Sequence, residues 1–275
     1  MICSWEELLS ILPPKLRQDV NRLGKERLQE LRLRLQCQPE LNLGGTRLYL
    51  QHRTTPEDIS YIINSASRYS PWRSATLAKG YLTAPGGHRI GVCGEALVRQ
   101  GSVAGMTSFD SVCIRVCRDF PGIAPAAEEI AGSVLIIGPP GWGKTTLLRD
   151  LARQLGKAET TVVIDERGEL FPKGIPKGQG LDVLTHCPKG TGIDNVLRTM
   201  GPQCIAVDEI TSREDSLSLL HAANCGVRLL ATAHAGSAAD LRSRECYRPF
   251  LEKGIFDTLL RLHRNQTYTL ERMGA

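Results

Sequence analysis

Hydrophobic and polar residues in the N-terminal part of the chain follow helical and strand-like periods in turn. A weakly amphipathic stretch over residues 4–22 predicts a helix. In "LQELRLRL" the leucines alternate with arginines, which predicts a half-buried strand whose arginines face outward. The stretch "TPEDISYIINSASRYS" is typical of a capped helix, with Thr55 as N-cap and Pro56 at the first helical position.

The period changes at about residue 80. Residues 80–118 contain strand-like segments divided by glycine-rich turns, a pattern that predicts an antiparallel meander. Cys113 and Cys117 share a parity, which places them on one face of a strand, and core packing is favoured there over a metal site. The first part of the chain is therefore predicted to form an α+β domain.

The second part of the chain has a different pattern, and "FPGIAPAAEEIAG" is the best candidate for the boundary. We expect an N-terminal domain over 1–122 and a second domain over 123–275. Short apolar runs that end in polar residues then alternate with segments long enough for crossovers: "SVLIIG", "TTVVID", "CIAVDE" and "VRLLATAH". This alternation predicts an α/β domain whose parallel sheet is covered on both faces, with functional residues at the carboxyl ends of its strands.

Composition places the chain among ordinary globular proteins. Hydrophobic residues make up 41% and charged residues 23% of its 275 residues, and no apolar run has the roughly 18 residues of a membrane span. The first residues include acids where a signal peptide has basic residues, and the nine cysteines form no paired CxxC motif. We therefore expect an intracellular protein with reduced thiols. The net charge of +5 permits contact with nucleic acid without indicating it.

A phosphate-binding loop follows the first apolar run of the second domain. "GPPGWGKTT" contains a complete G-x-x-x-x-G-K-[ST] motif, the Walker A loop, between a predicted strand and a predicted helix. Its glycines let backbone N–H groups point at phosphate oxygens, and the helix N-terminus favours the anion. The residues expected to bind the nucleotide are Gly138, Pro139, Pro140, Gly141, Trp142, Gly143, Lys144, Thr145 and Thr146.

Three residues of this loop have more specific expectations. Lys144 adds a cation near the β and γ phosphates, and Thr145 is expected to ligate Mg²⁺. Trp142 is bulky for such a loop. It either packs beside the base or a neighbouring subunit, or is an exposed aromatic residue without a role.

The run "CIAVDEI" ends in two adjacent acids. Asp208 suits a second-sphere role at Mg²⁺, and Glu209 stands where a carboxylate can polarise the water that attacks the γ phosphate. This pair favours hydrolysis over simple binding. The alternative is a strand end that carries two solvated acids.

Two further strand ends contribute polar residues to the same edge. In "VVIDERGEL" one of Asp165, Glu166 and Glu169 is expected to face the nucleotide, and the spacing does not say which; we place Glu166 in the candidate catalytic set. Helix capping or salt bridges account for the others. His234 ends "LLATAH", where it either senses the γ phosphate or is merely exposed.

With these motifs in place, the chain resembles the secretion-ATPase branch of hexameric P-loop motors, and more specifically the stage III sporulation protein AA family of endospore-forming bacteria. The segments that carry the resemblance are "GGHRIGVCGEA", "IRV", "PPGWGKTTLLRDLAR", "VIDERGEL", "DVLTHCPK", "LRTMGPQCIAVDEI" and "ATAHA". The resemblance implies a RecA-like P-loop ATPase domain preceded by a smaller α+β domain. It also implies ATP and Mg²⁺ as cofactors.

The resemblance further implies a cytoplasmic ATPase of the mother cell, assembled as a homo-oligomeric ring, expected to be a hexamer. The ring would lie at the base of the channel complex that joins mother cell and forespore, held peripherally at the membrane by channel proteins. In traffic ATPases, arginines of the N-terminal domain complete a neighbouring subunit's site, and Arg89 and Arg115 occupy similar places here. For each, an ordinary strand-edge or salt-bridge role stays open. Arg198 matches a recurring arginine, and Trp142 stands where the family usually has a small residue.

Two other classes of function are weaker readings of the same motifs. A nucleic-acid-stimulated motor would use aromatic residues to stack bases, and aromatic residues make up only 5% of the chain. Nucleic acid is therefore not an expected partner, although a nucleotide-gated assembly switch stays open. A small-molecule kinase is disfavoured because Glu209 would bring water to the γ phosphate.

Overall fold

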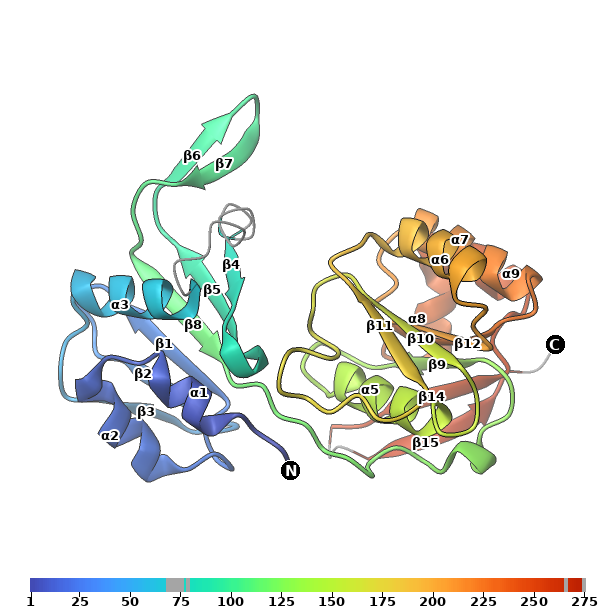
Figure 1. The fold of residues 1–275 in the computed structure, drawn as a ribbon, viewed down its shortest axis with the longest axis horizontal. Helices are drawn as coiled ribbons and strands as arrows, with labels where there is room; N and C mark the ends of the chain where they lie inside the picture. The colour runs from blue at the N-terminus through green and yellow to red at the C-terminus, as the bar shows by residue number, and fades with distance from the viewer. Residues whose placement is uncertain (68–76, 78–79, 265–266, 274–275) are drawn as a thin grey trace. The chain divides into compact units, whose positions relative to one another are not determined.

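A computed structural model describes residues 1–67, 77, 80–264 and 267–273 of the chain. The chain divides into two compact units (Figure 1). Unit 1 is Met1–Asp119 with Pro172–Ile175, and unit 2 is Phe120–Phe171 with Pro176–Ala275. Within the described ranges, no helix has the length and apolar character needed to cross a membrane.

Unit 1 contains a six-stranded sheet in the order β3-β2-β1-β8-β5-β4. All neighbouring pairs in it are antiparallel. Its strands are β1 (Glu30–Arg34), β2 (Glu40–Asn42), β3 (Arg47–Tyr49), β4 (Tyr81–Thr83), β5 (Arg89–Cys93) and β8 (Ser111–Arg115). The predicted strand with alternating leucines is β1, and its leucines at positions 31 and 33 are buried.

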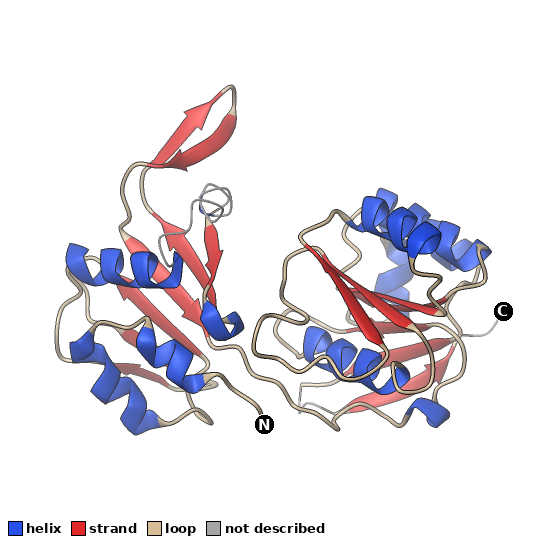
Figure 2. Ribbon diagram, viewed as in Figure 1, coloured by secondary structure: helices blue, strands red, loops and turns tan. Residues whose placement is uncertain are grey.

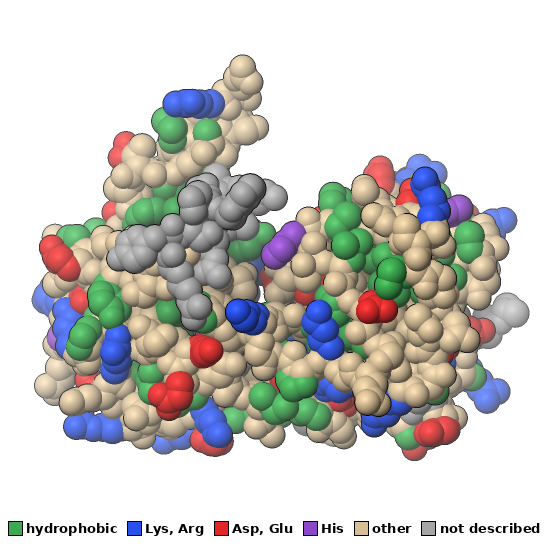
Figure 3. Space-filling model, viewed as in Figure 1, with side chains coloured by type: hydrophobic (Ala, Val, Ile, Leu, Met, Phe, Trp, Pro, Cys, Tyr) green, Lys and Arg blue, Asp and Glu red, His purple; other side chains and the backbone are tan. Residues whose placement is uncertain are grey.

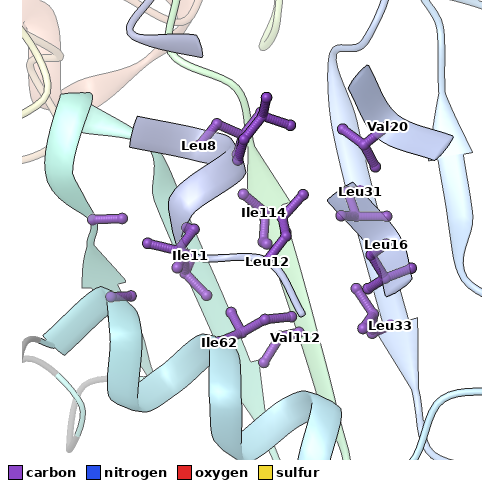
Figure 4. Packing of buried hydrophobic residues seen from close by; sticks show 14 of the residues in the cluster. Leu8, Ile11, Leu12, Leu16, Val20, Leu31, Leu33, Ile62, Val112 and Ile114 are labelled. Atoms are coloured by element: carbon purple, nitrogen blue, oxygen red, sulfur yellow. The ribbon is translucent and has the colours of Figure 1, made fainter. Parts of the chain in front are cut away.

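Three helices cover one face of this sheet: α1 (Trp5–Ser10), α2 (Pro14–Leu23) and α3 (Pro56–Ser67). Figure 4 shows how side chains from these helices pack against those of β1 and β8. The prediction of one helix over 4–22 was wrong, because the chain breaks after α1 and Pro14 starts a second helix. A proline fits the first turn of a helix and disrupts its interior.

Helix α3 begins as predicted. The Asp58 N–H donates to Thr55 Oγ1 (3.4 Å), and the Thr55 N–H donates to Asp58 Oδ2 (2.9 Å). This reciprocal pair satisfies backbone donors that have no partner inside the helix. The last three residues of the predicted helical stretch, 68–70, lie outside the described residues.

The opposite face of the unit 1 sheet carries polar and charged side chains. In β8, Val112 and Ile114 are buried in the core, whereas Cys113 lies on the other face with Glu30 and is half-buried. Burial, together with the Glu30 carboxylate, raises the pKa of the Cys113 thiol to about 11. Cys117 follows the end of β8, so the prediction that both cysteines share one strand face in the core was wrong.

The predicted meander over 80–118 was wrong in one respect. Strands β6 (Ala96–Arg99) and β7 (Ser102–Met106) leave the sheet and pair with each other in a separate hairpin, which projects from β5 and β8 in Figure 1. Figure 3 shows hydrophobic and basic side chains on the surface of this hairpin. The alternating pattern of the sequence identifies strands but does not say which partner each one takes.

Unit 2 contains a seven-stranded sheet in the order β11-β10-β12-β13-β9-β14-β15. The strands from β11 to β14 are parallel, and β15 is antiparallel to β14. They are β9 (Val134–Ile137), β10 (Thr161–Asp165), β11 (Leu181–Thr185), β12 (Cys204–Val207), β13 (Arg228–Ala233), β14 (Thr258–Leu262) and β15 (Tyr268–Arg272). The four predicted strands form its centre, and β11, β14 and β15 extend it.

Helices cover both faces of the unit 2 sheet (Figure 2). Helix α5 (Lys144–Leu155) packs on one face against β9, β10, β12 and β13. On the other face, α6 (Lys189–Thr199), α7 (Arg213–Asn224) and α9 (Arg248–Glu252) share a core with alternate residues of the strands. Helix α8 (Ala238–Ser243) precedes α9. The predicted α/β class is confirmed, and the carboxyl ends of the parallel strands meet at one edge of the sheet.

Candidate nucleotide-binding site

The Walker A loop joins β9 to α5. Gly141 (φ 78°) and Gly143 (φ 95°) take left-handed backbone conformations, which residues other than glycine rarely adopt. Gly143 is the N-cap residue of α5, so the free N–H groups of the first helical turn lie next to the loop. A Cβ on Gly138 would lie 3.2 Å from Leu262 Cβ, so a larger residue would press on β14. The loop therefore has the backbone shape that a phosphate cradle requires.

Lys144 is the first residue of α5 and is buried. Its Nζ donates to Gly138 O (2.8 Å) and Pro139 O (3.0 Å) and lies 2.8 Å from His234 Nδ1. Burial lowers the pKa of this ammonium group, although the Asp208 carboxylate opposes the shift. Because a protonated lysine only donates, His234 Nδ1 accepts here and Nε2 carries the ring proton.

Asp208 lies directly after β12 and is held by two hydroxyl groups. Thr145 Oγ1 donates to its Oδ2 (2.9 Å), and Thr232 Oγ1 of β13 donates to its Oδ1 (2.8 Å). Hydroxyl and carboxylate oxygens are the ligands that Mg²⁺ prefers. The predicted pair Thr145 and Asp208 is thus brought together with donor atoms that fit this ion.

Glu209 has a strained backbone, with φ at 47°. Residues other than glycine rarely adopt this left-handed conformation, and strained residues of this kind are often found at functional sites. The Glu209 N–H donates to Thr232 Oγ1 (2.8 Å). Its Oε1 lies 2.8 Å from His234 Nε2, and its Oε2 lies 3.4 Å from Arg167 Nη1. A chain of contacts therefore runs from Lys144 through His234 to Glu209.

The acids after β10 have different surroundings. Asp165 is buried and accepts from the backbone N–H groups of Glu169 (2.8 Å), Leu170 (2.9 Å) and Phe171 (3.1 Å). Burial raises the pKa of its carboxyl, and the backbone hydrogen bonds oppose that shift. Glu166 is more exposed, and its Oε2 lies 2.7 Å from Lys189 Nζ.

The acids at the ends of β10 and β12 line a common pocket in unit 2. Acids predominate in its lining, which is formed by Asp165, Glu166, Arg167, Glu169, Lys189, Asp208 and Glu209. The Asp165 carboxylate accepts hydrogen bonds from the turn that follows β10, whereas Glu166 and Glu169 are the other two acids of that segment in the pocket lining.

The predicted arginines lie in unit 1, where the structure brings them together. Arg89 and Arg115 are direct cross-strand partners in β5 and β8. The Arg89 guanidinium carbon lies 4.8 Å from the centre of the Tyr81 ring, and Arg115 Nε lies 3.6 Å from Glu30 Oε2. Like charges placed directly opposite each other destabilise a sheet. The Glu30 carboxylate beside Arg115 offsets part of this repulsion within the sheet.

Comparison with known families identifies the chain. The family described as "Sporulation stage III, protein AA" matches residues 4–269. The chain belongs to this family. It is 36% identical over 278 residues to Stage III sporulation protein AA of Bacillus subtilis (strain 168), a match that covers 94% of this chain and 91% of that protein. The resemblance predicted from the sequence motifs is confirmed.

This member of the stage III sporulation protein AA family shares its fold with solved ATPase structures. The X-ray structure of the Legionella pneumophila ATPase DotB matches with a TM-score of 0.62 and 18% identity, over 95% of this chain and 80% of that chain. The crystal structure of the pilus retraction motor PilT with bound ADP matches with a TM-score of 0.62 and 17% identity, over 93% and 80%. The predicted fold, a RecA-like domain after a smaller α+β domain, is confirmed.

Some predicted residues of this sporulation-family chain lie at the margin of the site. Pro140 and Gly141 are exposed at the loop, whereas Pro139, Trp142 and Thr146 are half-buried. Arg198 is exposed near the end of α6 and is not part of the pocket lining.

Two side chains with direct contacts at the site were not predicted. Thr232 lies inside the apolar run of β13 and bonds Asp208, and Lys189 opens α6 and bonds Glu166. The only available signal for Lys189 was its position after "LTHCP", at the end of a strand that the sequence pattern did not reveal. Thr232 had no signal, because a threonine in a buried strand is common.

Proposed function

We propose that this protein is a Mg²⁺-dependent ATPase of the secretion type that works as a homo-oligomeric ring, expected to be a hexamer. The convergence of Lys144, Thr145, Asp208, Glu209 and His234 at the ends of neighbouring parallel strands carries the proposal. P-loop enzymes hydrolyse nucleotides with a lysine, a hydroxyl group and carboxylates of this kind, and the contacts between these residues support a common site.

The residues divide the work of binding. The N–H groups of the loop and the Lys144 ammonium group bind the β and γ phosphates of ATP. Thr145 and Asp208 hold Mg²⁺, which neutralises phosphate charge when bound. Among the described residues no cluster of three or more His, Cys, Asp or Glu side chains could hold a metal ion. Thr145 and Asp208 would hold a Mg²⁺ ion together with ligands from outside the chain, such as phosphate oxygens and water.

Glu209 acts on the attacking water. Its carboxylate orients the water and accepts its proton, while the His234 Nε2–H donates to Oε1 and holds the carboxylate in place. Because His234 Nδ1 also contacts Lys144, a ligand that draws Lys144 toward its phosphates alters the contact that holds Glu209. His234 thus links occupancy of the loop to the position of the base.

We propose that Arg89 and Arg115 take part in a nucleotide site that is shared between two neighbouring subunits. Their side-by-side placement offers two guanidinium groups to one anionic partner, which is the arrangement that stabilises charge on a transferred phosphoryl group. Each site would be complete only in the ring, with the pair supplied by a neighbouring subunit. Membership of the sporulation family supports a place at the channel between mother cell and forespore, on the cytoplasmic side and bound to channel proteins.

The test is phosphate release from MgATP, measured across a range of protein concentrations. Wild type is compared with Lys144→Ala and Glu209→Gln. The control is Lys157→Ala, an exposed residue two positions after the end of α5. Turnover that rises steeply with concentration in wild type and the control, and vanishes in the other two variants, supports the proposal.

Two outcomes would contradict the proposal. Tight nucleotide binding with flat, negligible phosphate release at all protein concentrations would favour an assembly switch. Release that depends on added single-stranded DNA, and is lost at raised salt, would favour a nucleic-acid motor.

A further inference from the structure

Lys189 is a buried charged residue in the acid-rich pocket at the ends of β10 and β12, and the mechanism above does not use it. It opens α6 directly after Pro188, and only 7% of its surface is exposed. Lysine is almost never buried this far without a partner of opposite charge, because taking an ammonium group out of water is costly. Its partners therefore indicate its role.

The Lys189 ammonium group lies between a carboxylate of a loop and a carboxylate of a helix. Nζ is 2.7 Å from Glu166 Oε2, in the loop after β10, and 3.7 Å from Asp215 Oδ2, in the first turn of α7. Glu166 lines the pocket. Lys189 thus joins a pocket acid to the beginning of another helix.

Asp215 in turn fixes the segment that carries Glu209. Its Oδ2 accepts from the N–H groups of Thr211 (2.9 Å) and Ser212 (3.2 Å), and its own N–H donates to Ser212 Oγ in a capping box. Thr211 and Ser212 follow Glu209 by two and three residues. The ammonium group is therefore connected to both strand ends that present carboxylates to the pocket.

The positive charge of Lys189 also affects the acids of the pocket. The pocket holds Glu166 near Asp208, Glu209 and further acids, and like charges repel one another. The buried Lys189 ammonium group beside the exposed Glu166 offsets that repulsion and holds one of its carboxylate oxygens. Without the Lys189 cation, repulsion from the other acids favours conformations in which the Glu166 carboxylate points to solvent.

We propose that Lys189 is a positioning residue for hydrolysis. It holds the Glu166 carboxylate in the pocket and, through Asp215, holds the loop that carries Glu209, so that both carboxylates face the γ phosphate at a set spacing. The inference rests on the proposed ATPase function. Lys189 itself touches neither nucleotide nor water in this role.

The test compares Lys189→Met, which keeps the length of the side chain and removes its charge, with Lys189→Arg and with the exposed control Lys177→Met. Steady-state turnover of MgATP gives kcat and KM for each. We expect Lys189→Met to lower kcat by about 10- to 100-fold, the range seen when a supporting partner is lost, with KM changed less than about threefold. Lys189→Arg should recover most of kcat, and Lys177→Met should match wild type.

A double-mutant cycle separates positioning from general stabilisation of the fold. If part of the effect of Lys189 runs through Glu166, the loss of kcat in the double variant Lys189→Met/Glu166→Gln is clearly smaller than the product of the two single losses. Fully additive losses, or a kcat for folded Lys189→Met equal to that of wild type, would overturn the proposal.

Amide hydrogen exchange gives a readout that does not depend on turnover. Lys189→Met should speed exchange at Thr211 and Ser212, whereas Lys189→Arg and Lys177→Met should leave it unchanged. If wild type releases no phosphate, the ATPase proposal fails. In that case, faster exchange at these amides would still support Lys189 as the tie between the two loops, and unchanged exchange would refute it.

Discussion

At the scale of single residues, neighbouring acids of this protein have different partners. Asp165 and Glu166 are adjacent and both line the pocket, yet Asp165 accepts from the backbone of its own loop while Glu166 pairs with Lys189. Both are strand-end carboxylates, so their spacing in the sequence could not distinguish them. The difference arises from the tight turn after β10, which directs three N–H groups at one carboxylate.

Asp165→Ala should loosen that turn. The substitution leaves the N–H groups of Glu169, Leu170 and Phe171 without their acceptor, and each buried unpaired donor costs about 1–3 kcal/mol. We expect amide exchange at these three residues to accelerate by at least about tenfold, which corresponds to about 1.4 kcal/mol. Asp182→Ala, on the exposed side of β11, is the control and should leave their exchange unchanged. Equal exchange in wild type and Asp165→Ala would show that the carboxylate does not hold the turn.

At the scale of elements, the unit 1 sheet separates a core face from a polar face within each strand. Ile114 is buried against the helices, while the adjacent Cys113 lies among charged side chains. The sequence shows a strand at this point, because its apolar residues alternate with others. It did not show that Cys113 lies on the polar face, since cysteine is more often buried than exposed.

This separation predicts unequal effects of substitutions at adjacent positions. Ile114→Ala should lower the free energy of unfolding by about 2–5 kcal/mol, because it leaves a cavity between the sheet and its helices. Cys113→Ala should lower it by no more than about 1 kcal/mol. Urea-induced unfolding followed by circular dichroism measures both changes. A loss at Cys113 as large as that at Ile114 would mean that the core extends to the other face.

At the scale of the whole molecule, the proposed catalytic groups are divided between the two units. Arg89 and Arg115 belong to unit 1, and the P-loop and its acids belong to unit 2. If the arginines of one subunit complete the nucleotide site of its neighbour, ATP is hydrolysed only after the subunits have assembled into a ring.

Subunit mixing tests that division directly. Arg115→Ala keeps an intact pocket, and Lys144→Ala keeps intact arginines, so each should be nearly inactive alone. In randomly mixed rings about a quarter of the interfaces join an intact pocket to an intact arginine pair, and turnover should recover accordingly. The measurement is phosphate release after the two variants are mixed in equal amounts. No recovery, under conditions where wild-type subunits exchange, would place the arginines outside a shared site.

The extent of successful prediction follows from the range of the interactions. The glycines of the phosphate loop, the N-cap of α3 and the four central strands of unit 2 depend on neighbours along the chain, so backbone preferences and short apolar runs identified them. The break between α1 and α2 was also local, and the adjacent prolines carried its signal. The sequence by itself therefore determined the fold class, the order of the motifs and the family.

Tertiary structure decided what depends on residues far apart in the sequence. It paired β6 with β7 outside the sheet, placed Arg89 opposite Arg115, joined Lys144 to His234 and set Lys189 beside Glu166. Hydrogen bonds and ion pairs act over a few ångströms, and folding brings those groups within that reach. The spacing of residues along the chain carries no such distance, which is why only the folded structure shows that Asp165 accepts from its own turn while Glu166 pairs with Lys189.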